Sequence, residues 1–433
     1  MLGLFNDYDD ATRELMHSLE TAGVPLTPVV INYGGELADG ALCPFVVYTG
    51  LELRGEPLFF NEVPIPPWCE IRQGSEVYGE VLRDDEVIGR INYEANTFRQ
   101  VESVDWLLRD GSVGHTDRYD RYGNRYAVSY YADGVAHQTV YRGPGEWTIE
   151  VDHVVRSVVM RSAGRLLTFP SLTDFVSHFV DEQGLADDEV LINSLSYPLF
   201  VMRTRARRPN TTLFWQEPMP GDPPENMTTE LQQPKALARI VFFDERLRRK
   251  VAAQYPETPV HLEYLSHLDQ FAAHESFDPK RVFTLTNSDD LAGLPELLEA
   301  FPDLTFSVAA LTLMSERLHE LGRRHSNLVL TPSITHHRIR DELEKASVYL
   351  DINAGGHVLD VVKAAYYLDL VVMALAGRAK APDFSLTFAT PSELRARLDA
   401  ATSSSEGRRA ALAALHEQHG PLSSVDDYRR LLG

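Results

Sequence analysis

The sequence is poor in cysteine and in positive charge. Its 433 residues include two cysteines, Cys43 and Cys69. They allow one disulfide at most, so a secreted fold built on disulfides is not indicated. Lys and Arg total 41 against 63 Asp and Glu, which gives a formal net charge of −22. This deficit argues against nucleic-acid binding and against a polybasic contact with a membrane.

Long hydrophobic runs and metal-ligand patterns are also missing. The first residues, MLGLFNDYDDATREL, have neither the basic region nor the apolar stretch of a signal peptide. The longest apolar run, near residues 370–376, is too short to span a bilayer. His336 and His337 lack companions for a metal site, and no Ser/His/Asp triad is evident. We therefore expect a cytoplasmic protein without metal or cofactor.

The chain does contain a strand–glycine loop–helix–strand unit at residues 346–376. VYLDI and LVVMAL read as buried strands, AGGH as a turn and HVLDVVKAAYYLD as a helix. Such units build parallel sheets, and ligands bind at the carboxyl ends of their strands. The loop from Asp351 to His357 is therefore a candidate site.

Short apolar strand segments alternate with helical segments elsewhere in the chain, and this pattern predicts two Rossmann-like domains. The first starts with a helix at 10–22, a strand at 28–31 and two short extended segments in CPFVVYTGLELRGEPLFF. The second has strands in VHLEYLSH, RVFTLT, LTFSVAAL, SNLVLTPS, SVYLDI, LVVMALA and FSLTFAT. TSSSEG reads as a flexible linker between closing helices. We divide the chain into 1–64 with 169–255, 65–168, 256–400 and 401–433.

Residues 65–168 differ, because short alternating runs are separated by turn pairs such as Asp110-Gly111 and Asp133-Gly134. This pattern predicts an antiparallel β-meander inserted into the first Rossmann-like domain. Its aromatic residues suit a partner interface, although ordinary cross-strand pairs would look the same. The candidate interface residues are Tyr119, Tyr122, Tyr126, Tyr130 and Tyr131.

Two α/β domains flanking a cleft are the GT-B glycosyltransferase architecture, whose retaining members need cations and a spaced carboxylate pair for a nucleotide-sugar. Here Asn287-Ser288-Asp289-Asp290 follows the first strand of the second domain, where cations would be needed. Asp360 matches one carboxylate, but Ile352 stands eight positions earlier. We therefore predict no catalytic residue. The alternative is an active transferase that uses His357 and Asp360 with a UDP-sugar.

Polar residues after strands of the first domain predict a different ligand. Trp215, Gln216 and Glu217 follow a buried strand and should face the cleft. Trp and Gln suit stacking on a sugar and hydrogen bonding to an acceptor, although a structural Trp would give the same pattern. The predicted acceptor-binding residues are Asn193, Ser194, Trp215, Gln216, Glu217, Asn287, Ser288, Asp351, Asn353, Gly355, Gly356 and His357.

Long collinear segments resemble one family. They include LFNDYDDATRELMHSLETAGV, GEPLFFNEVPIPPWCEI, VDWLLRDGSVGHTDRYDRYGNRYA, LFWQEPMPGDPPENM and VYLDINAGGHVLDVVKAAY. They are similar to the stabilising (B) subunit of O-linked N-acetylglucosaminyltransferases from accessory Sec systems, which glycosylate serine-rich repeat adhesins before export.

The resemblance implies a GT-B-like fold with the inserted meander and a non-catalytic role. A separate catalytic A subunit would bind the UDP-sugar. This chain would stabilise the A subunit, pair with it through the meander and help to hold a serine/threonine-rich polypeptide. Peripheral membrane association would then come through the complex.

Overall fold

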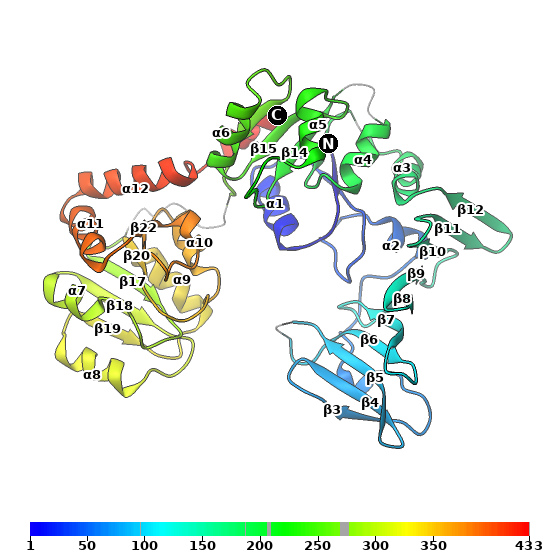
Figure 1. Cartoon of the computed structure of the whole chain (residues 1–433), viewed down its shortest axis with the longest axis horizontal. Coiled ribbons are helices and arrows are strands. Elements are labelled where there is room, and N and C mark those ends of the chain that lie inside the picture. Colours follow the sequence, from blue (N-terminus) through cyan, green and yellow to red (C-terminus); the bar gives the residue numbers. More distant parts are fainter. Residues whose placement is uncertain (96, 187, 206–208, 269–276, 433) are drawn as a thin grey trace. The chain divides into compact units, whose positions relative to one another are not determined.

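The computed structural model describes residues 1–95, 97–186, 188–205, 209–268 and 277–432. It contains two six-stranded sheets with parallel pairing and one ten-stranded antiparallel sheet (Figure 1). The chain forms two compact units, Met1–Phe242 with Val251–Glu263 and Phe243–Lys250 with Tyr264–Gly433. The mixed α/β class predicted from the sequence is confirmed.

The first parallel sheet has the order β16-β15-β14-β13-β1-β2. Its strands are β1 (Leu2–Phe5), β2 (Thr27–Val30), β13 (Val190–Ile192), β14 (Thr211–Trp215), β15 (Leu237–Phe242) and β16 (His261–Tyr264). The strand predicted in VHLEYLSH for the second domain is β16, so that placement was wrong. Its apolar pattern fits either sheet, and only the chain path assigns it to the edge of the first.

The helices of the first unit are α1 (Asp10–Thr21), α2 (Pro44–Thr49), α3 (Leu172–Glu182), α4 (Tyr197–Arg205) and α5 (Glu225–Gln232). The start of α6 (Glu245–Gln254) belongs to the second unit and its end to the first. The segment CPFVVYT was predicted to be extended and is instead α2. Pro44 suits a first helical turn, and Gly50 ends the helix at φ 62°. Phe45 stacks on Tyr141 at 4.1 Å between ring centroids, so tertiary packing outweighs the β propensity of the two valines.

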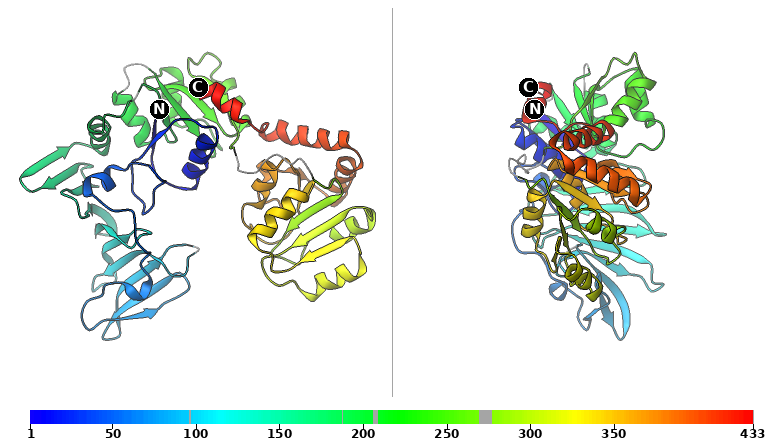
Figure 2. Two further views of the ribbon diagram at one scale, coloured as in Figure 1. Left: turned by 180° about the vertical axis from the view of Figure 1, so that it is seen from behind. Right: turned by 90° about the vertical axis from the view of Figure 1, so that its left-hand side faces the viewer.

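The ten-stranded sheet is a meander whose strands pair in chain order (Figure 2). They are β3 (Glu70–Gln73), β4 (Tyr78–Arg83), β5 (Glu86–Tyr93), β6 (Val101–Leu107), β7 (Val113–Tyr119), β8 (Arg125–Ala132), β9 (Val135–Tyr141), β10 (Thr148–Asp152), β11 (Val158–Ser162) and β12 (Arg165–Phe169). The predicted antiparallel meander is confirmed. It packs on the first parallel sheet's domain through aromatic pairs such as Tyr33–Tyr126, with ring centroids 4.7 Å apart.

The second parallel sheet has the order β19-β18-β17-β20-β21-β22. Its strands are β17 (Arg281–Leu285), β18 (Thr305–Ala309), β19 (Leu328–Thr331), β20 (Val348–Asp351), β21 (Val371–Leu375) and β22 (Leu386–Phe388), as predicted. Alternate residues face opposite sides, so Val282 packs with one layer of helices and Phe283 with the other.

Helices cover both faces of this sheet. α7 (Leu294–Ala300), α8 (Glu316–Arg324) and α11 (Pro391–Ser403) pack on the Val282 side, and α9 (His336–Lys345) and α10 (Val361–Tyr367) on the Phe283 side. α12 (Ser405–His419) and α13 (Val425–Leu432) close the chain. The linker predicted in TSSSEG is absent, because Ser404 ends α11 and its side chain caps α12 by accepting from the Gly407 N–H.

His419 at the end of α12 makes the stability of the second unit pH-dependent. Its ring is 4% exposed and lies 4.2 Å from the ring of Phe384 between centroids. Burial lowers its pKa to about 4, whereas an unfolded histidine titrates near 6.5. Because the folded pKa is depressed, the stabilisation is complete above pH ~6.5 and is lost as the pH falls towards 4.

We expect wild type to lose about 3 kcal/mol of unfolding free energy over that window relative to His419→Gln. Urea unfolding of both proteins between pH 7.5 and 4 measures the difference. A pH-independent difference between the two proteins would contradict the assignment.

Candidate functional site

The glycine loop after β20 leads to a shorter helix than the sequence predicted. The helix expected from His357 begins at Val361, and Asp360 is its N-cap residue. Leu359 has a left-handed backbone at φ 53°, which interrupts helical geometry before that point. Asp360 forms no side-chain cap hydrogen bond. Gly356 and His357 are exposed on this loop, as a ligand site would require.

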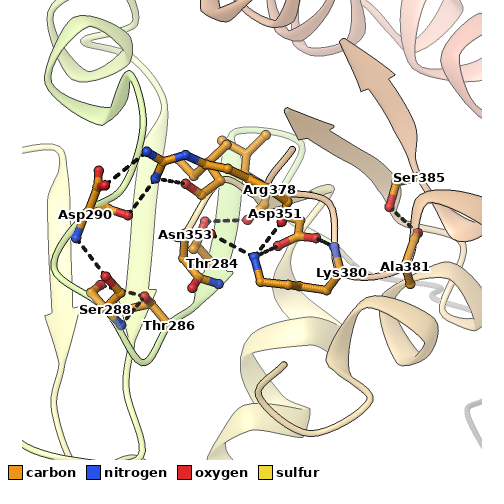
Figure 3. A network of polar contacts seen from close by, with 12 residues as sticks. Thr284, Thr286, Ser288, Asp290, Asp351, Asn353, Arg378, Lys380, Ala381 and Ser385 are labelled. Atoms are coloured by element: carbon orange, nitrogen blue, oxygen red, sulfur yellow. Dashed lines mark hydrogen bonds and ion pairs between the residues drawn. The ribbon is translucent and has the colours of Figure 1, made fainter. Parts of the chain in front are cut away.

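Arg378 follows β21, and its side chain points to Asp290 in the loop after β17 (Figure 3). Its Nη2 donates to Asp290 Oδ2 at 3.0 Å, and its Nη1 donates to the Asp290 carbonyl at 3.0 Å and to the Ile352 carbonyl at 3.3 Å. The guanidinium holds the pKa of Asp290 below its usual range. The cation is therefore engaged by groups of its own domain.

Lys380 is engaged in the same way by Asp351 (Figure 3). The Lys380 backbone N–H donates to Asp351 Oδ2 at 2.5 Å, and Nζ lies 3.5 Å from Oδ1. Nζ also donates to the Asn353 carbonyl at 2.7 Å. Asp351 is 1% exposed, and burial raises its pKa although Lys380 opposes that shift. A diphosphate would have to compete with these internal partners for both cations.

A cavity of about 150 Å³ lies beside this network. Its lining includes Asp351, Asn353, His357, Asp360 and Lys380. Pockets that enclose drug-sized ligands are typically ~300–1,000 Å³. The cavity brings together His357 and Asp360, the pair of the catalytic alternative, but it is small for a nucleotide-sugar.

The other predicted residues of this unit lie around the same loop. Asn287 is exposed, and its Oδ1 would lie 1.8 Å from a Cβ at Gly355, so a larger residue at Gly355 would displace the Asn287 side chain. Ser288 Oγ accepts from the Asp290 N–H at 3.2 Å. Asn353 is 2% exposed, and its Oδ1 is without a hydrogen-bond partner among the described residues. The structure thus gathers these residues, but it buries Asp351 and Asn353.

Most of the predicted acceptor-binding residues in the first unit are buried or hydrogen-bonded to other parts of the same unit. Trp215 is only 4% exposed at the end of β14, so the expected surface for stacking on a sugar is not there. Gln216 Nε2 donates to the Ala11 carbonyl at 2.6 Å. Asn193 Nδ2 donates to Thr12 Oγ1 at 2.7 Å. These amides join strand ends to α1, whereas Glu217 is exposed and Ser194 partly so.

The five tyrosines predicted at a partner interface do not share one exposed surface. Tyr119 and Tyr126 are 7% and 6% exposed, and burial raises the pKa of both phenols to about 12. Tyr126 is used in packing against Tyr33 within the chain. Tyr122 and Tyr131 are half-buried, and Tyr130 is 44% exposed. Tyr119 and Tyr126 therefore offer little surface to a partner, and the interface prediction stays a prediction for the three more exposed tyrosines.

Sequence reasoning missed Arg378 and Lys380. Both stand in AGRAK, immediately after the buried strand LVVMAL. A basic pair at the carboxyl end of a parallel strand was a usable signal. Among the residues that the structure describes, no cluster of three or more His, Cys, Asp or Glu side chains is placed to hold a metal ion. None of the helices in the described ranges has the length and apolarity of a membrane span.

Three family models match the chain in succession: the GtfB middle domain at residues 69–170, the GtfB third domain at 172–252 and the GftB/GlyA-F C-terminal domain at 282–414. The UDP-N-acetylglucosamine–peptide N-acetylglucosaminyltransferase stabilizing protein GtfB of Streptococcus gordonii is 32% identical over 86% of this chain and 84% of its own length. The chain belongs to the GtfB family. The resemblance seen in the sequence is thereby confirmed.

Another GtfB relative and one solved structure match over the full length. GtfB of Limosilactobacillus reuteri subsp. suis is 27% identical over 100% of this chain and 99% of its own. One chain of a crystal structure of a GtfA/B complex bound to UDP and GlcNAc has a TM-score of 0.81 and 30% identity, covering 100% of this chain and 99% of that one. The three-sheet fold is thus shared with a glycosyltransferase complex.

Proposed function

We propose that this chain is the non-catalytic stabilizing and acceptor-binding subunit of a protein O-GlcNAc transferase complex. Membership of the GtfB stabilizing proteins supports the role. The observation that carries the non-catalytic part is the internal pairing of Arg378 with Asp290 and of Lys380 with Asp351. A transferase must stabilise the negative charge of the leaving diphosphate, and cations already paired with carboxylates supply little of that.

The partner in this proposal is a catalytic subunit of the GtfA type. The GtfA/B complex with 30% identity supports that pairing. The two parallel-sheet domains would form a GT-B-like pair, and the exposed side of the meander would meet the partner. Such a complex would act in the cytoplasm or at the cytoplasmic face of the membrane.

The acceptor is a serine/threonine-rich polypeptide, such as a serine-rich adhesin before accessory-Sec export. Of the predicted contacts, Glu217, Asn287, Gly356 and His357 are exposed and available to it. Hydroxyl groups need hydrogen-bonding partners rather than a concentrated positive charge, and these residues supply carboxylate, amide, backbone and imidazole groups.

Reconstitution with the GtfA-type protein from the same source tests the proposal. We expect no transfer from UDP-GlcNAc by this chain alone, greater transfer by the complex than by the partner alone, and a higher melting temperature for the bound partner. Transfer by this chain alone, or unchanged partner stability, would refute the assignment.

The catalytic alternative is separated by a second measurement on the complex. Because His357 and Asp360 line one small cavity, His357→Ala with Asp360→Asn would abolish all transfer if they were catalytic. We expect transfer to persist, with any loss appearing in acceptor KM. Size-exclusion chromatography confirms that the variant still assembles.

A further inference from the structure

A second cavity, of about 410 Å³, lies within the first unit between its parallel sheet and the meander. One wall follows the carboxyl ends of β1 and β2 and includes Asp7, Tyr8 and Glu36. The other wall comes from two turns of the meander and includes Glu94 and Asp120. Carboxyl ends of parallel strands are where open α/β sheets bind ligands, so the position itself favours a binding site.

The walls of this cavity are joined by direct contacts. The Arg121 N–H donates to the Gly35 carbonyl at 3.2 Å, and the Tyr33 hydroxyl donates to Asp120 Oδ2 at 3.1 Å. Gly35 has φ 101°, and a Cβ there would lie 3.4 Å from Asp120 Cα. The meander and the parallel sheet therefore enclose a preformed space rather than a gap between separate modules.

The charges around the cavity do not balance. Five carboxylates line it (Asp7, Asp9, Glu36, Glu94 and Asp120) against two arginines, Arg13 and Arg121. Both arginines pair with the same carboxylate, Glu36. Within the described part of the chain, the other four carboxylates have no ion-pair partner. The lining therefore carries a net formal charge of −3, from five acids and two arginines.

The surroundings of single side chains in the cavity also indicate a negative electrostatic potential. Partial desolvation and the neighbouring carboxylates of Glu102 and Glu36 raise the pKa of Glu94, although its side chain is exposed. Asp120 is 2% exposed and is held by neutral donors: the Tyr33 hydroxyl, the Tyr122 backbone N–H, and both the backbone N–H and the side-chain amide of Asn124. The Tyr8 ring already carries one cation on a face, with Arg13 Cζ 4.6 Å from its centroid. Carboxylates beside an aromatic ring suit an ammonium or guanidinium group.

We propose that this cavity binds a lysine or arginine side chain of a bound polypeptide. The proposal rests on the proposed function, because the polypeptide is taken to be the serine/threonine-rich acceptor. The cavity would supply charge selectivity that hydroxyl recognition lacks, since Asp7 and Glu94 attract a cation without contacting the hydroxyl groups that receive sugar. A basic residue would thereby fix where along a repetitive acceptor the chain binds.

The test uses the full chain and two labelled serine/threonine-rich peptides of equal length. One has lysine at every fifth position, and the other has norleucine there, which keeps the apolar stem without the charge. Fluorescence anisotropy at low salt is expected to show about five- to tenfold tighter binding of the lysine peptide. The advantage should shrink as salt is raised, because exposed charge pairs are screened.

Variants assign that advantage to the cavity. Asp7→Asn with Glu94→Gln changes two exposed lining positions and keeps their shape, so the lysine advantage should fall to about twofold or less. Asp7→Asn gives up one of the two hydrogen bonds that the carboxylate accepts from Asn6 and Asn32, so the variant should stay folded with a slightly lower melting temperature. Glu86→Gln is the matched control, because Glu86 is an exposed acid in β5 outside the cavity lining. It should keep the full advantage.

The outcomes separate the two proposals. Equal binding of both peptides, or a lysine advantage that survives in the double variant, would overturn the cavity assignment and leave acceptor binding intact. If neither peptide bound the chain or its complex, the acceptor-binding part of the proposed function would fail, and the cavity proposal with it.

Discussion

Replacing Glu230 with alanine is expected to destabilise the first unit by about 3–5 kcal/mol. Glu230 lies in α5 with no exposed surface. Its Oε2 accepts from the backbone N–H groups of Lys235, Ala236 and Leu237 at 3.1, 3.0 and 2.9 Å, and its Oε1 accepts from Arg203 Nε at 2.8 Å. Truncation would leave these donors unsatisfied at the point where β15 begins.

The pH dependence has a definite sign. Burial alone would raise the pKa of Glu230, but the backbone donors and Arg203 outweigh it, and the pKa is lowered. A depressed folded pKa contributes stability that is present above the unfolded pKa of ~4.3 and is lost as the pH falls below it. Wild type should therefore lose stability on acidification in a step that Glu230→Gln lacks.

Glu225→Ala is the matched control, because Glu225 is an exposed acid in the first turn of the same helix. We expect it to cost less than about 1 kcal/mol. Urea unfolding at pH 7 compares all three variants with wild type, and repeating it below the unfolded pKa of ~4.3 for wild type and Glu230→Gln measures the acid step. A loss below about 1 kcal/mol for Glu230→Ala would show that water replaces the carboxylate and that the network is not a stability determinant.

The sequence predicted those parts of the fold whose signal is local. The strands of the second parallel sheet are short and mostly apolar runs, and Asp-Gly pairs mark turns of the meander. CPFVVYT misled because its β-branched residues favour strands, whereas the contact of Phe45 with Tyr141 comes from residues almost a hundred positions later. Likewise β16 has the pattern of any edge strand, and only its neighbour β15 fixes its sheet.

The sequence predicted where the candidate site lies in the fold, but not that its cations are paired with carboxylates. Parallel-strand topology placed the candidate loop directly after a buried strand, and the structure has it there, after β20, although its role as a ligand site stays a prediction. That the site's cations are engaged depends on Arg378 meeting Asp290 and Lys380 meeting Asp351, pairs separated by 88 and 29 positions. Burial of Trp215 and Tyr126 is equally non-local, because aromatic residues suit cores and interfaces alike.

The other large expected effect concerns the meander. Tyr130→Asp should weaken binding of a GtfA-type catalytic subunit by about 30-fold or more, which corresponds to roughly 2 kcal/mol. Tyr130 is 44% exposed and ends an aromatic row across three strands. The His115 ring lies 6.0 Å from that of Tyr130 and 6.2 Å from that of Trp106, between centroids.

The row is ordered before any partner binds, because Trp106 Nε1 donates to Asp117 Oδ2 at 3.0 Å. A preordered aromatic surface loses little entropy on binding, so its burial yields most of its apolar free energy. An aspartate in place of Tyr130, at the exposed end of the row, would instead put a charge into a desolvated contact, which is why a large effect is expected. Binding is measured by titration calorimetry of the purified pair.

Val77→Asp provides the control, because it introduces the same charge at an exposed apolar residue before β4, away from the aromatic row. If the row meets the partner, Val77→Asp leaves affinity within about twofold of wild type, and both variants melt like wild type. Equal weakening by both would point to net charge rather than a defined contact. Unchanged binding by Tyr130→Asp would show that the interface lies away from this part of the sheet. It would also contradict the expectation that the meander's exposed aromatic residues, rather than its buried tyrosines, recognise the catalytic subunit.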